Sequence, residues 1–284
     1  MPRPRPTSPS GRPAAASTPA PRALRQSTLP FAAAGPSSSK KAAGGAKARG
    51  APPSKKLLPP PGRLDLGAGA ALLYLPAHFP AGPADALLAA LRSEVDWEQR
   101  DVTVWGRTVP QRRLVAYQAG PGSRAPYTYS GLTLAPSPFS PAVAAVKAAV
   151  EAVAGCAFDT ALLNLYRDGA DAMAWHADGE ALYGPPPTVI GSASFGVARA
   201  FQLRPTPGGR AEGRPDLPAT RIEYALGHGD VLVMSGTTQR DWQHAVPPRC
   251  FGGVRVNLTF RATAAFKARE AAAGRGGVPA LKGG

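Results

Sequence analysis

The first 64 residues of this 284-residue chain contain no aspartate or glutamate, and Asp65 is the first acidic residue. They carry 12 lysines and arginines among many prolines, alanines, serines and glycines. A segment of this composition cannot bury enough apolar surface to fold alone. We therefore predict that residues 1–64 form a disordered basic arm. Residues 264–284, with a net charge of +3, predict a second disordered basic tail.

Removing the charge of these two ends from the chain's net charge of +15 leaves residues 65–263 electrically balanced. We expect that segment to be the one folded domain. The basic charge thus belongs to the ends, and a flexible basic arm attracts phosphate backbones without sequence preference. The same composition, rich in Arg, Ser and Ala, is also typical of organelle transit peptides. We expect a nuclear protein, with a transit peptide to a chloroplast or mitochondrion as the alternative.

The sequence also lacks long apolar runs and has few sulfur ligands. No stretch approaches the roughly 20 apolar residues of a membrane-spanning helix, so we expect no membrane contact. The two cysteines, Cys156 and Cys250, do not stand near other ligand residues at zinc-site spacing. Without a secretory signal they are expected to be free thiols. We expect the protein to be a monomer.

Hydrophobic periodicity predicts two helices followed by many short strands. The helices are expected at 84–95 and 141–154, the second entered through Ser140 as N-cap with Pro141 at its first position. Strands are expected at 71–75, 102–109 with a break at Gly106, 160–166, 172–176, 188–204, 221–226, 230–235, 243–246 and 253–262. This order predicts an α+β domain whose β part is a sandwich or jelly roll.

Two of the chain's four histidines stand in a pattern that fits a metal site. In His176-Ala177-Asp178 the two ligand residues are at i and i+2, on one face of a strand. His244 follows Asp178 by 66 residues. Two imidazoles and one carboxylate on one face of an octahedral ion form the facial triad of non-haem Fe(II) oxygenases. His78 and His228 stand in turns and are interpreted as structural.

A bare His-x-Asp pattern also arises by chance, and the strand from Arg255 to Arg261 adds weight to it. Its residues alternate strictly, with one polar face and one apolar face: Arg255, Asn257, Thr259 and Arg261 against Val256, Leu258 and Phe260. Inward-facing arginines need an anionic partner, because unpaired buried charge is costly. A dicarboxylate co-substrate supplies two such groups, and a guanidinium fork suits each. The alternative is a solvated face of an antiparallel sheet.

Four motifs then occur in a characteristic order: LLNLYRDGADAMAWHADGE (162–180), SASFGVARAFQLR (192–204), TTQRDWQHAVP (237–247) and RVNLTFR (255–261). The series resembles the AlkB family of Fe(II)- and 2-oxoglutarate-dependent nucleic-acid dealkylases, above all its eukaryotic DNA-repair members. The resemblance runs from about residue 65 to residue 262. It implies a double-stranded β-helix, with Fe(II) held by His176, Asp178 and His244 as the catalytic centre. It also implies 2-oxoglutarate and O2 as co-substrates.

The resemblance assigns six residues to 2-oxoglutarate: Asn164, Tyr166, Arg255, Asn257, Thr259 and Arg261. Arg261 and Asn164 would bind the carboxylate next to the metal, and Arg255, Tyr166 and Asn257 the far carboxylate. For Asn164 and Tyr166, ordinary strand packing is the alternative. The implied activity is oxidation of the N-methyl group of 1-methyladenine or 3-methylcytosine, with release of formaldehyde, succinate and CO2. Such lesions pair poorly, which lowers the cost of flipping them out.

Substrate contacts are expected between residues 102 and 131, with Glu180 beside the metal pattern. Tyr127-Thr128-Tyr129 matches the family segment that forms the wall of the nucleotide pocket, where aromatic rings stack a flipped base. Val104-Trp105-Gly106 stands where duplex-acting relatives place an apolar wedge, although Trp105 could equally belong to a hairpin core. The residues expected to hold phosphates are Arg107 and its neighbours Arg100, Arg112, Arg113 and Arg124.

Relatives usually follow the metal aspartate with Asp-Glu, whereas this chain has Gly179-Glu180, which leaves the base preference open. We expect single- or double-stranded DNA as substrate, with RNA or tRNA as the alternative. A non-catalytic nucleic-acid-binding relative and a protein hydroxylase of the same fold are the rival hypotheses. In the arm, Gln26-Ser27-Thr28-Leu29-Pro30-Phe31 partly resembles a sliding-clamp docking box, with a single aromatic one position early.

Overall fold

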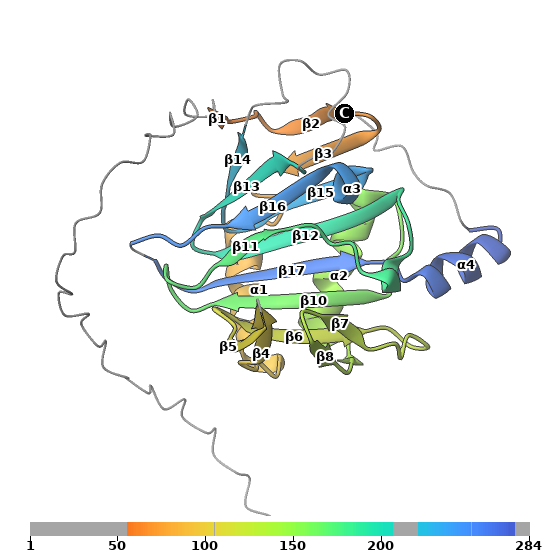
Figure 1. Cartoon of the computed structure of the whole chain (residues 1–284), viewed down its shortest axis with the longest axis horizontal. Helices are drawn as coiled ribbons and strands as arrows, with labels where there is room; N and C mark the ends of the chain where they lie inside the picture. Colours follow the sequence, from red (N-terminus) through yellow and green to blue (C-terminus); the bar gives the residue numbers. More distant parts are fainter. Residues whose placement is uncertain (1–55, 105, 207–220, 251, 276–284) are drawn as a thin grey trace, which may run out of the picture. The chain divides into compact units, whose positions relative to one another are not determined.

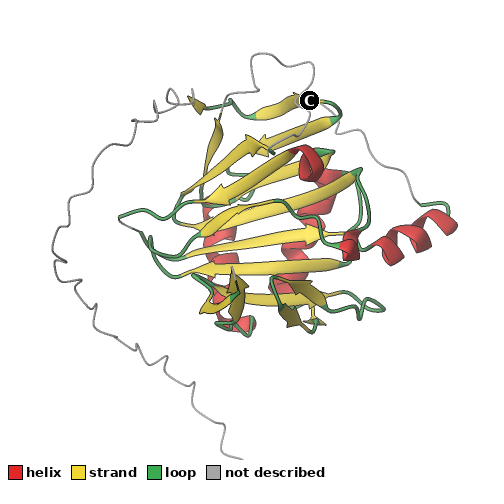
Figure 2. Cartoon of the chain, in the orientation of Figure 1, coloured by secondary structure: helices red, strands yellow, loops and turns green. Residues whose placement is uncertain are grey.

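The computed structural model describes residues 56–104, 106–206, 221–250 and 252–275. Two sheets face each other, and two helices pack behind the larger sheet (Figure 1). The fold is a double-stranded β-helix, or jelly roll, within an α+β domain, as the sequence predicts (Figure 2). Within the described ranges, no helix has the length and apolar character needed to span a bilayer.

The larger sheet has eight strands in the order β2-β3-β15-β12-β17-β10-β6-β9. In that order their bounds are Gly62–Gly67, Ala70–Leu75, Asp230–Gly236, Thr188–Gly196, Arg255–Arg261, Thr160–Tyr166, Leu114–Ala119 and Ser137–Pro138. The central strands β12, β17 and β10 are antiparallel, and Asn257 of β17 lies opposite Ser194 on one side and Asn164 on the other. This register brings residues far apart in the sequence onto one face.

The smaller sheet has five strands in the order β1-β14-β13-β16-β11. Their bounds are Lys56–Leu57, Arg221–Leu226, Arg199–Pro205, Trp242–Val246 and Met173–His176. Within the described residues, the short strand β11 forms one edge of this sheet and pairs with β16, with His176 opposite His244. The ladder between β11 and β16 therefore brings two expected metal ligands together.

Two hairpins lie beside the β6 end of the larger sheet (Figure 1). One consists of β4 (Asp101–Val104) and β5 (Arg107–Pro110), the other of β7 (Tyr127–Tyr129) and β8 (Leu132–Leu134). The backbone N–H of Thr103 donates to the carbonyl of Ser130 at 2.9 Å, which joins the two hairpins. The segment in which substrate contacts are expected is thus one connected unit.

Helices α1 (Ala81–Glu94) and α2 (Pro141–Ala154) cover the outer face of the larger sheet. The α2 bounds match the sequence prediction: the Ser140 hydroxyl accepts from the Val143 N–H at 3.4 Å, and Gly155 ends the helix with φ 68°. Close packing of α2 on β12 depends on Gly191, where a Cβ would come within 2.3 Å of Val150. The remaining helical elements are the 3-10 turn Ala181–Tyr183, α3 (Thr238–Asp241) and α4 (Ala264–Ala272).

Apolar residues form separate clusters on the two faces of the larger sheet. Val256, Leu258 and Phe260 of β17 pack under the helices, whereas a second cluster lies between the sheets. The described elements extend beyond the expected domain limits at both ends: β1 and β2 begin before residue 65, and α4 follows residue 263. The domain limits of 65 and 263 and the disorder of the two ends stay predictions.

Candidate active site

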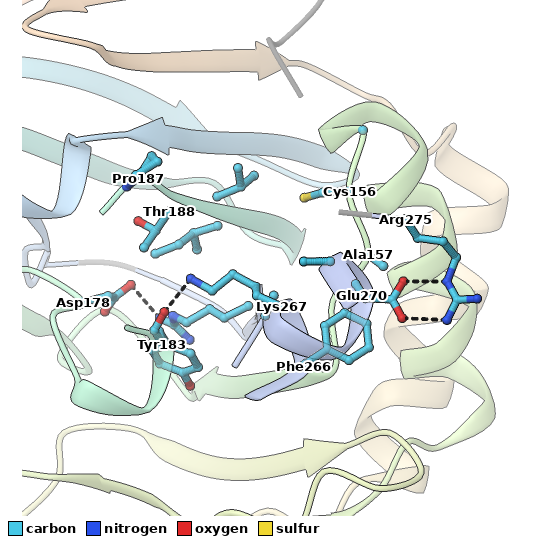
Figure 3. A pocket seen from close by; sticks show the side chains of 16 residues that line it. Cys156, Ala157, Asp178, Tyr183, Pro187, Thr188, Phe266, Lys267, Glu270 and Arg275 are labelled. Carbon is cyan, nitrogen blue, oxygen red and sulfur yellow. Dashed lines mark hydrogen bonds and ion pairs between the residues drawn. The ribbon is translucent and has the colours of Figure 1, made fainter. Parts of the chain in front are cut away.

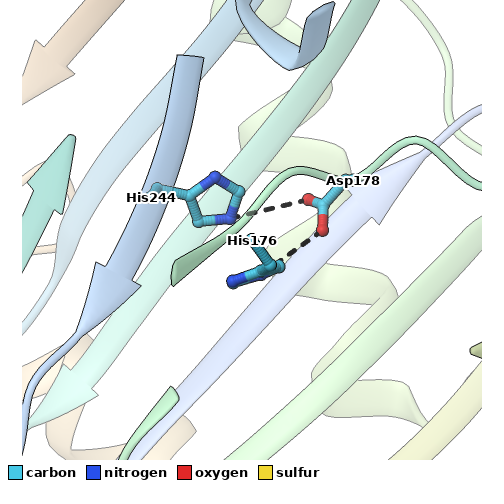
Figure 4. A group of neighbouring side chains, drawn as sticks. All are labelled: His176, Asp178 and His244. Carbon is cyan, nitrogen blue, oxygen red and sulfur yellow. Dashed lines mark ion pairs between the residues drawn. The ribbon is translucent and has the colours of Figure 1, made fainter. Parts of the chain in front are cut away.

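His176 at the end of β11, Asp178 two residues later and His244 on β16 form a compact group (Figure 4). One ligand atom from each residue lies within 4.8 Å of the other two. The Nε2 atoms of His176 and His244 lie 3.6 Å and 3.9 Å from the carboxylate oxygens of Asp178. Among the described residues, His176, Asp178 and His244 are the His, Cys, Asp or Glu side chains that lie close enough together to hold a metal ion.

The local structure explains why these three atoms converge. His176 ends strand β11, and Asp178 follows two residues later, so both side chains turn toward β16 and His244. The carbonyl of Ala174 lies 2.8 Å from His176 Nδ1, so Nδ1 carries the proton and Nε2 is left as a ligand atom. Metal-binding histidines commonly donate their second N–H to a carbonyl in this way. The donor set fits Fe(II).

Charge in the site is arranged to keep the ligands in their metal-binding forms. Burial alone would raise the pKa of Asp178, but the Arg261 guanidinium and the two imidazoles hold it well below its usual range. Arg261 Nη2 donates to the Asp178 carboxylate at 2.6 Å. Burial, with a further contribution from His176, lowers the pKa of His244 to about 3. Asp178 is therefore an anion and His244 a neutral imidazole near neutral pH.

A cavity of about 240 Å³ adjoins the three ligands. The polar face of β17 lines it, together with two residues of β10: Arg255, Asn257, Thr259, Arg261, Asn164 and Tyr166. The structure thus brings together the six residues that the sequence assigns to the co-substrate. Arg255 is fully buried, and its Nε and Nη1 atoms have no hydrogen-bond partner among the described residues. An anion in this cavity would satisfy them.

Hydrogen bonds hold the polar residues of the cavity in place. The Asn257 amide donates to the Ser192 hydroxyl at 2.8 Å and to the Ala193 carbonyl at 3.0 Å. Arg255 Nη2 donates to the Ser194 hydroxyl at 2.9 Å. The Arg255 guanidinium also lies 5.1 Å from the centre of the Tyr166 ring. Arg255 Nε and Nη1 and Arg261 Nε have no hydrogen-bond partner among the described residues. With these free donors beside the His-Asp-His group, the residues present fit a dicarboxylate next to an Fe(II) ion.

Two buried arginines near the cavity make contacts that the sequence did not predict. Arg113, expected at a phosphate, is buried instead, and its Nε donates to the Asn164 side-chain oxygen at 2.6 Å. Arg199 stacks on Tyr166 at 5.4 Å and donates to the carbonyls of Asp171 and Pro247. Arg113 precedes strand β6 and Arg199 begins strand β13. Hydrophobic periodicity does not predict buried charged residues, so these contacts could not be predicted from the sequence.

Aromatic residues of the β7–β8 hairpin form another wall of the cavity. Tyr127 and Tyr129 line it, and the Tyr127 hydroxyl donates to a Glu180 oxygen at 2.6 Å. Burial raises the pKa of Tyr127, so its phenol stays protonated and keeps that donor role. The other Glu180 oxygen is buried and has no hydrogen-bond partner among the described residues.

Four expected substrate residues lie outside the cavity or outside the described residues. Thr128 is exposed and shares a 3.1 Å hydrogen bond with Thr133, because alternate residues of a strand face opposite ways. Gly106 and Arg107 are exposed in the β4–β5 hairpin, away from the residues that line the cavity. Trp105, the expected wedge, lies outside the described residues.

A second cavity, of about 300 Å³, lies beneath α4 (Figure 3). It shares Asp178 and Arg261 with the first cavity and is otherwise largely apolar. Lys267 of α4 donates to the carbonyl of Tyr183 at 2.6 Å, and Glu270 pairs with Arg275 at its outer side. Sequence reasoning missed this cavity, because α4 falls in the segment predicted to be a tail.

A jelly roll with two histidines and one aspartate between its sheets defines a mononuclear Fe(II) oxygenase. The chain belongs to the 2OG-Fe(II) oxygenase superfamily, which its sequence matches over residues 71–261. Within it, the chain belongs to the AlkB homologues, as the following relatives show.

The DNA oxidative demethylase ALKBH2 of Arabidopsis thaliana is 35% identical over 70% of this chain and 68% of its own length. Human DNA oxidative demethylase ALKBH2 is 34% identical over 64% of this chain and 70% of its own length. The alpha-ketoglutarate-dependent dioxygenase alkB homolog 3 of Rattus norvegicus is 39% identical over 69% of this chain. The chain spans 64% of the length of that rat protein.

Proposed function

We propose that the protein oxidatively removes methyl groups from N-methylated bases in DNA, with 1-methyladenine and 3-methylcytosine as substrates. The observation that carries the proposal is one cavity in which the His-Asp-His group, two buried arginines and a tyrosine wall meet. Relatives that bear the name DNA oxidative demethylase support the choice of DNA. Bound Fe(II) would supply the activation of O2.

The reaction balances with 2-oxoglutarate as the source of two electrons. One oxygen atom of O2 enters the C–H bond of the N-methyl group, and the other enters the succinate formed as 2-oxoglutarate loses CO2. The N-hydroxymethyl group then breaks at its C–N bond. Formaldehyde leaves, and the base recovers its normal pairing edge.

In this proposal the protein's residues bind and orient the two organic substrates. Arg255, Tyr166 and Asn257 hold the far carboxylate of 2-oxoglutarate, and Arg261 with Asn164 lies at its near end. Arg261 also holds the Asp178 carboxylate, so it fixes a metal ligand and a co-substrate group together. Because both arginines are buried, water competes little for the carboxylates.

The flipped base would stack against Tyr127 and Tyr129, which Glu180 and Gln111 hold through their hydroxyl groups at 2.6 Å and 2.9 Å. The partnerless Glu180 oxygen can accept from the exocyclic amino group of adenine or cytosine. A Cβ at Gly179 would meet nothing within 4 Å, so space is left where relatives carry a second acid. Glu180 is therefore the carboxylate that recognises the base in this proposal.

Formaldehyde release tests the proposal. The full chain, loaded with Fe(II), 2-oxoglutarate and ascorbate, is incubated with single-stranded DNA, duplex DNA and RNA, each carrying 1-methyladenine or 3-methylcytosine. Release from DNA supports the proposal, and release from RNA alone would support an RNA demethylase instead. Absence of formaldehyde with all six substrates, under conditions in which Fe(II) and 2-oxoglutarate bind, would overturn it in favour of a non-catalytic binding protein.

Partners and location are part of the same proposal. Repair of DNA is consistent with a monomer in the nucleus that contacts DNA through its basic arm and has no membrane role. A transit peptide to a chloroplast or mitochondrion is the alternative for the same residues. The partial clamp-docking box at Gln26–Phe31 lies outside the described residues, and contact with a sliding clamp is tested by binding of a peptide covering it.

A further inference from the structure

The outer face of the smaller sheet carries a group of side chains back to back with the metal ligands. Strand residues alternate between faces, so the neighbours of His176 and His244 point away from the cavity. Trp175 precedes His176, and Gln243 precedes His244. Arg204 of β13 lies opposite Gln243 in the strand register. With Arg221 at the start of β14, these residues form what we call the Trp175 surface.

The geometry of the Trp175 surface is specific. The guanidinium carbons of Arg204 and Arg221 lie 4.3 Å and 5.5 Å from the centre of the Trp175 ring. Arg204 also donates twice to the Gln243 side-chain oxygen, at 3.1 Å and 2.9 Å. All four side chains are partly exposed. Two cations are thus oriented on one indole, where solvent or a partner can reach them.

Neither arginine has a carboxylate partner among the described residues. Glu223, the acid on the same face of β14, is bound instead by Lys56 and by the Gln202 amide. Two neighbouring guanidinium groups repel each other, and the Trp175 ring and the neutral Gln243 neutralise neither charge. The arrangement therefore favours an anion that spans both groups. Planar guanidinium forks suit phosphate oxygens.

We propose that the Trp175 surface binds phosphates of the substrate strand outside the nucleotide cavity. The inference rests on the proposed function and adds a path for the strand to it. A strand that leaves the cavity passes over the edge strand β11 to reach this surface, because β11 carries His176 on one face and Trp175 on the other. The Trp175 ring keeps the two guanidinium groups oriented, so that each can meet a phosphate of the strand.

The test compares the affinity of a methylated trinucleotide with that of a methylated single strand of about 15 nucleotides. The trinucleotide fills the cavity alone, whereas the longer strand also reaches the Trp175 surface. In wild type the longer strand should bind more tightly. In the double variant Arg204→Gln, Arg221→Gln that gain should fall by about tenfold, because both charge-assisted contacts are lost. Binding is measured by fluorescence anisotropy.

The salt dependence gives a second readout. The slope of log Kd against log salt for the longer strand should fall by about 1.4, since each phosphate contact on a single strand contributes about 0.7. Trp175→Leu should give a smaller loss of the same kind, because both guanidinium groups lose their platform. Arg92→Gln is the matched control, since Arg92 is exposed on α1, behind the other sheet.

Several results would overturn the inference. One is an unchanged gain and slope in a double variant whose thermal midpoint equals that of wild type. Equal losses in Arg92→Gln would show a general charge effect, and competition by polyglutamate as strong as that by DNA would show an unselective anion surface. Binding of unmethylated strands separates the inference from the proposed function. If the wild-type protein releases no formaldehyde, but the double variant binds the strand more weakly than wild type, only the proposed function is contradicted.

Discussion

At the scale of single residues, Asp178 is the point on which most of the site depends. It is the one anionic member of the metal group, and it also holds Arg261 in a buried ion pair. A substitution of Asp178 therefore affects both the metal ligands and the ion pair. A change there removes a ligand charge and at the same time leaves a buried guanidinium without its partner.

Asp178→Asn should therefore weaken Co(II) or Fe(II) binding by more than about a hundredfold, since changes in residues that only hydrogen-bond to metal ligands already cost about 10- to 100-fold. The amide keeps the shape of the carboxylate but lacks its charge. Titration calorimetry with Co(II) measures the loss. His78→Ala is the control, because His78 lies in the turn before α1 and should leave metal affinity unchanged. Loss of metal binding in His78→Ala would contradict the ligand assignment.

Buried His244 predicts a pH dependence of the stability of the metal-free protein. Burial lowers the pKa of His244 to about 3 in the folded state, so the unfolded state binds its proton first as the pH falls. The contribution to stability is complete above about pH 6.5 and is lost progressively below it, with a limiting slope of about 1.4 kcal/mol per pH unit. The lowered pKa of Asp178 adds loss of the same sign at lower pH.

Urea unfolding of the metal-free protein at about pH 7.5 and about pH 5 checks this sign. The free energy of unfolding should be lower at the acid pH, and His244→Gln should reduce the difference. His78→Gln is the matched control and should leave it as in wild type. A free energy that rises toward pH 5 would show that the buried imidazole is not neutral in the folded protein.

At the scale of elements, strand β17 separates two environments. Its apolar residues pack under the helices, and its polar residues line the cavity. The strict alternation in the sequence was sufficient to predict this division, because period 2 fixes which residues share a face. The partners on β12 and β10 came from the register, which the sequence pattern does not contain.

Arg255→Leu should raise the concentration of 2-oxoglutarate needed for half-maximal binding by at least about tenfold, since a charge-assisted hydrogen bond contributes about 1.5–3 kcal/mol. Leucine has a similar volume and leaves the strand apolar at that point. Binding is followed by the absorbance of the complex of protein, Fe(II) and 2-oxoglutarate without O2. Arg255→Lys should fall between leucine and wild type, and Arg92→Leu should equal wild type. An unchanged requirement in Arg255→Leu would remove Arg255 from the co-substrate site.

At the scale of the whole molecule, strand β1 determines how far the N-terminal arm can be deleted without loss of a strand of the smaller sheet. Lys56 and Leu57 pair with β14, and Lys56 forms an ion pair with Glu223. A deletion that ends at residue 60 would remove this strand. One that ends at residue 54 keeps it and takes away 9 of the 12 basic residues that precede Asp65.

Deleting residues 1–54 should weaken binding of unmethylated DNA at low salt and flatten its salt dependence, because fewer phosphates are neutralised. Thermal stability should stay within about 1 kcal/mol of the full chain, since no strand is lost. Anisotropy titrations at several salt concentrations measure the first effect, and a thermal melt measures the second. A truncated chain with the salt slope of the full chain would show that the arm does not contact DNA.

The sequence predicted much of the fold and of the metal site, but not the local irregularities. Helix α2 has the predicted bounds because Ser140, Pro141 and Gly155 mark both its ends. Helix α1 begins at Ala81 rather than 84, since no side chain caps its start. The predicted strand 188–204 is two strands, β12 and β13, that separate at Gly196 with φ 90°. Strands β1, β2 and β6 to β9 were not predicted. Four of them have only two or three residues, β6 carries no clear alternation, and β2 begins in the segment predicted to be an arm.

The pairing of His176 with His244 across β11 and β16 has a consequence for exchange of amide protons with solvent. Strand β11 has four residues and one partner strand among the described residues, so it should open at low free-energy cost. A bound metal ties β11 to β16 through side chains as well as through the ladder. Removal of the metal should therefore speed deuterium uptake in 173–176 far more than in the doubly flanked β17. Equal protection of β11 with and without Co(II), measured by mass spectrometry, would mean that the ladder alone holds this edge closed.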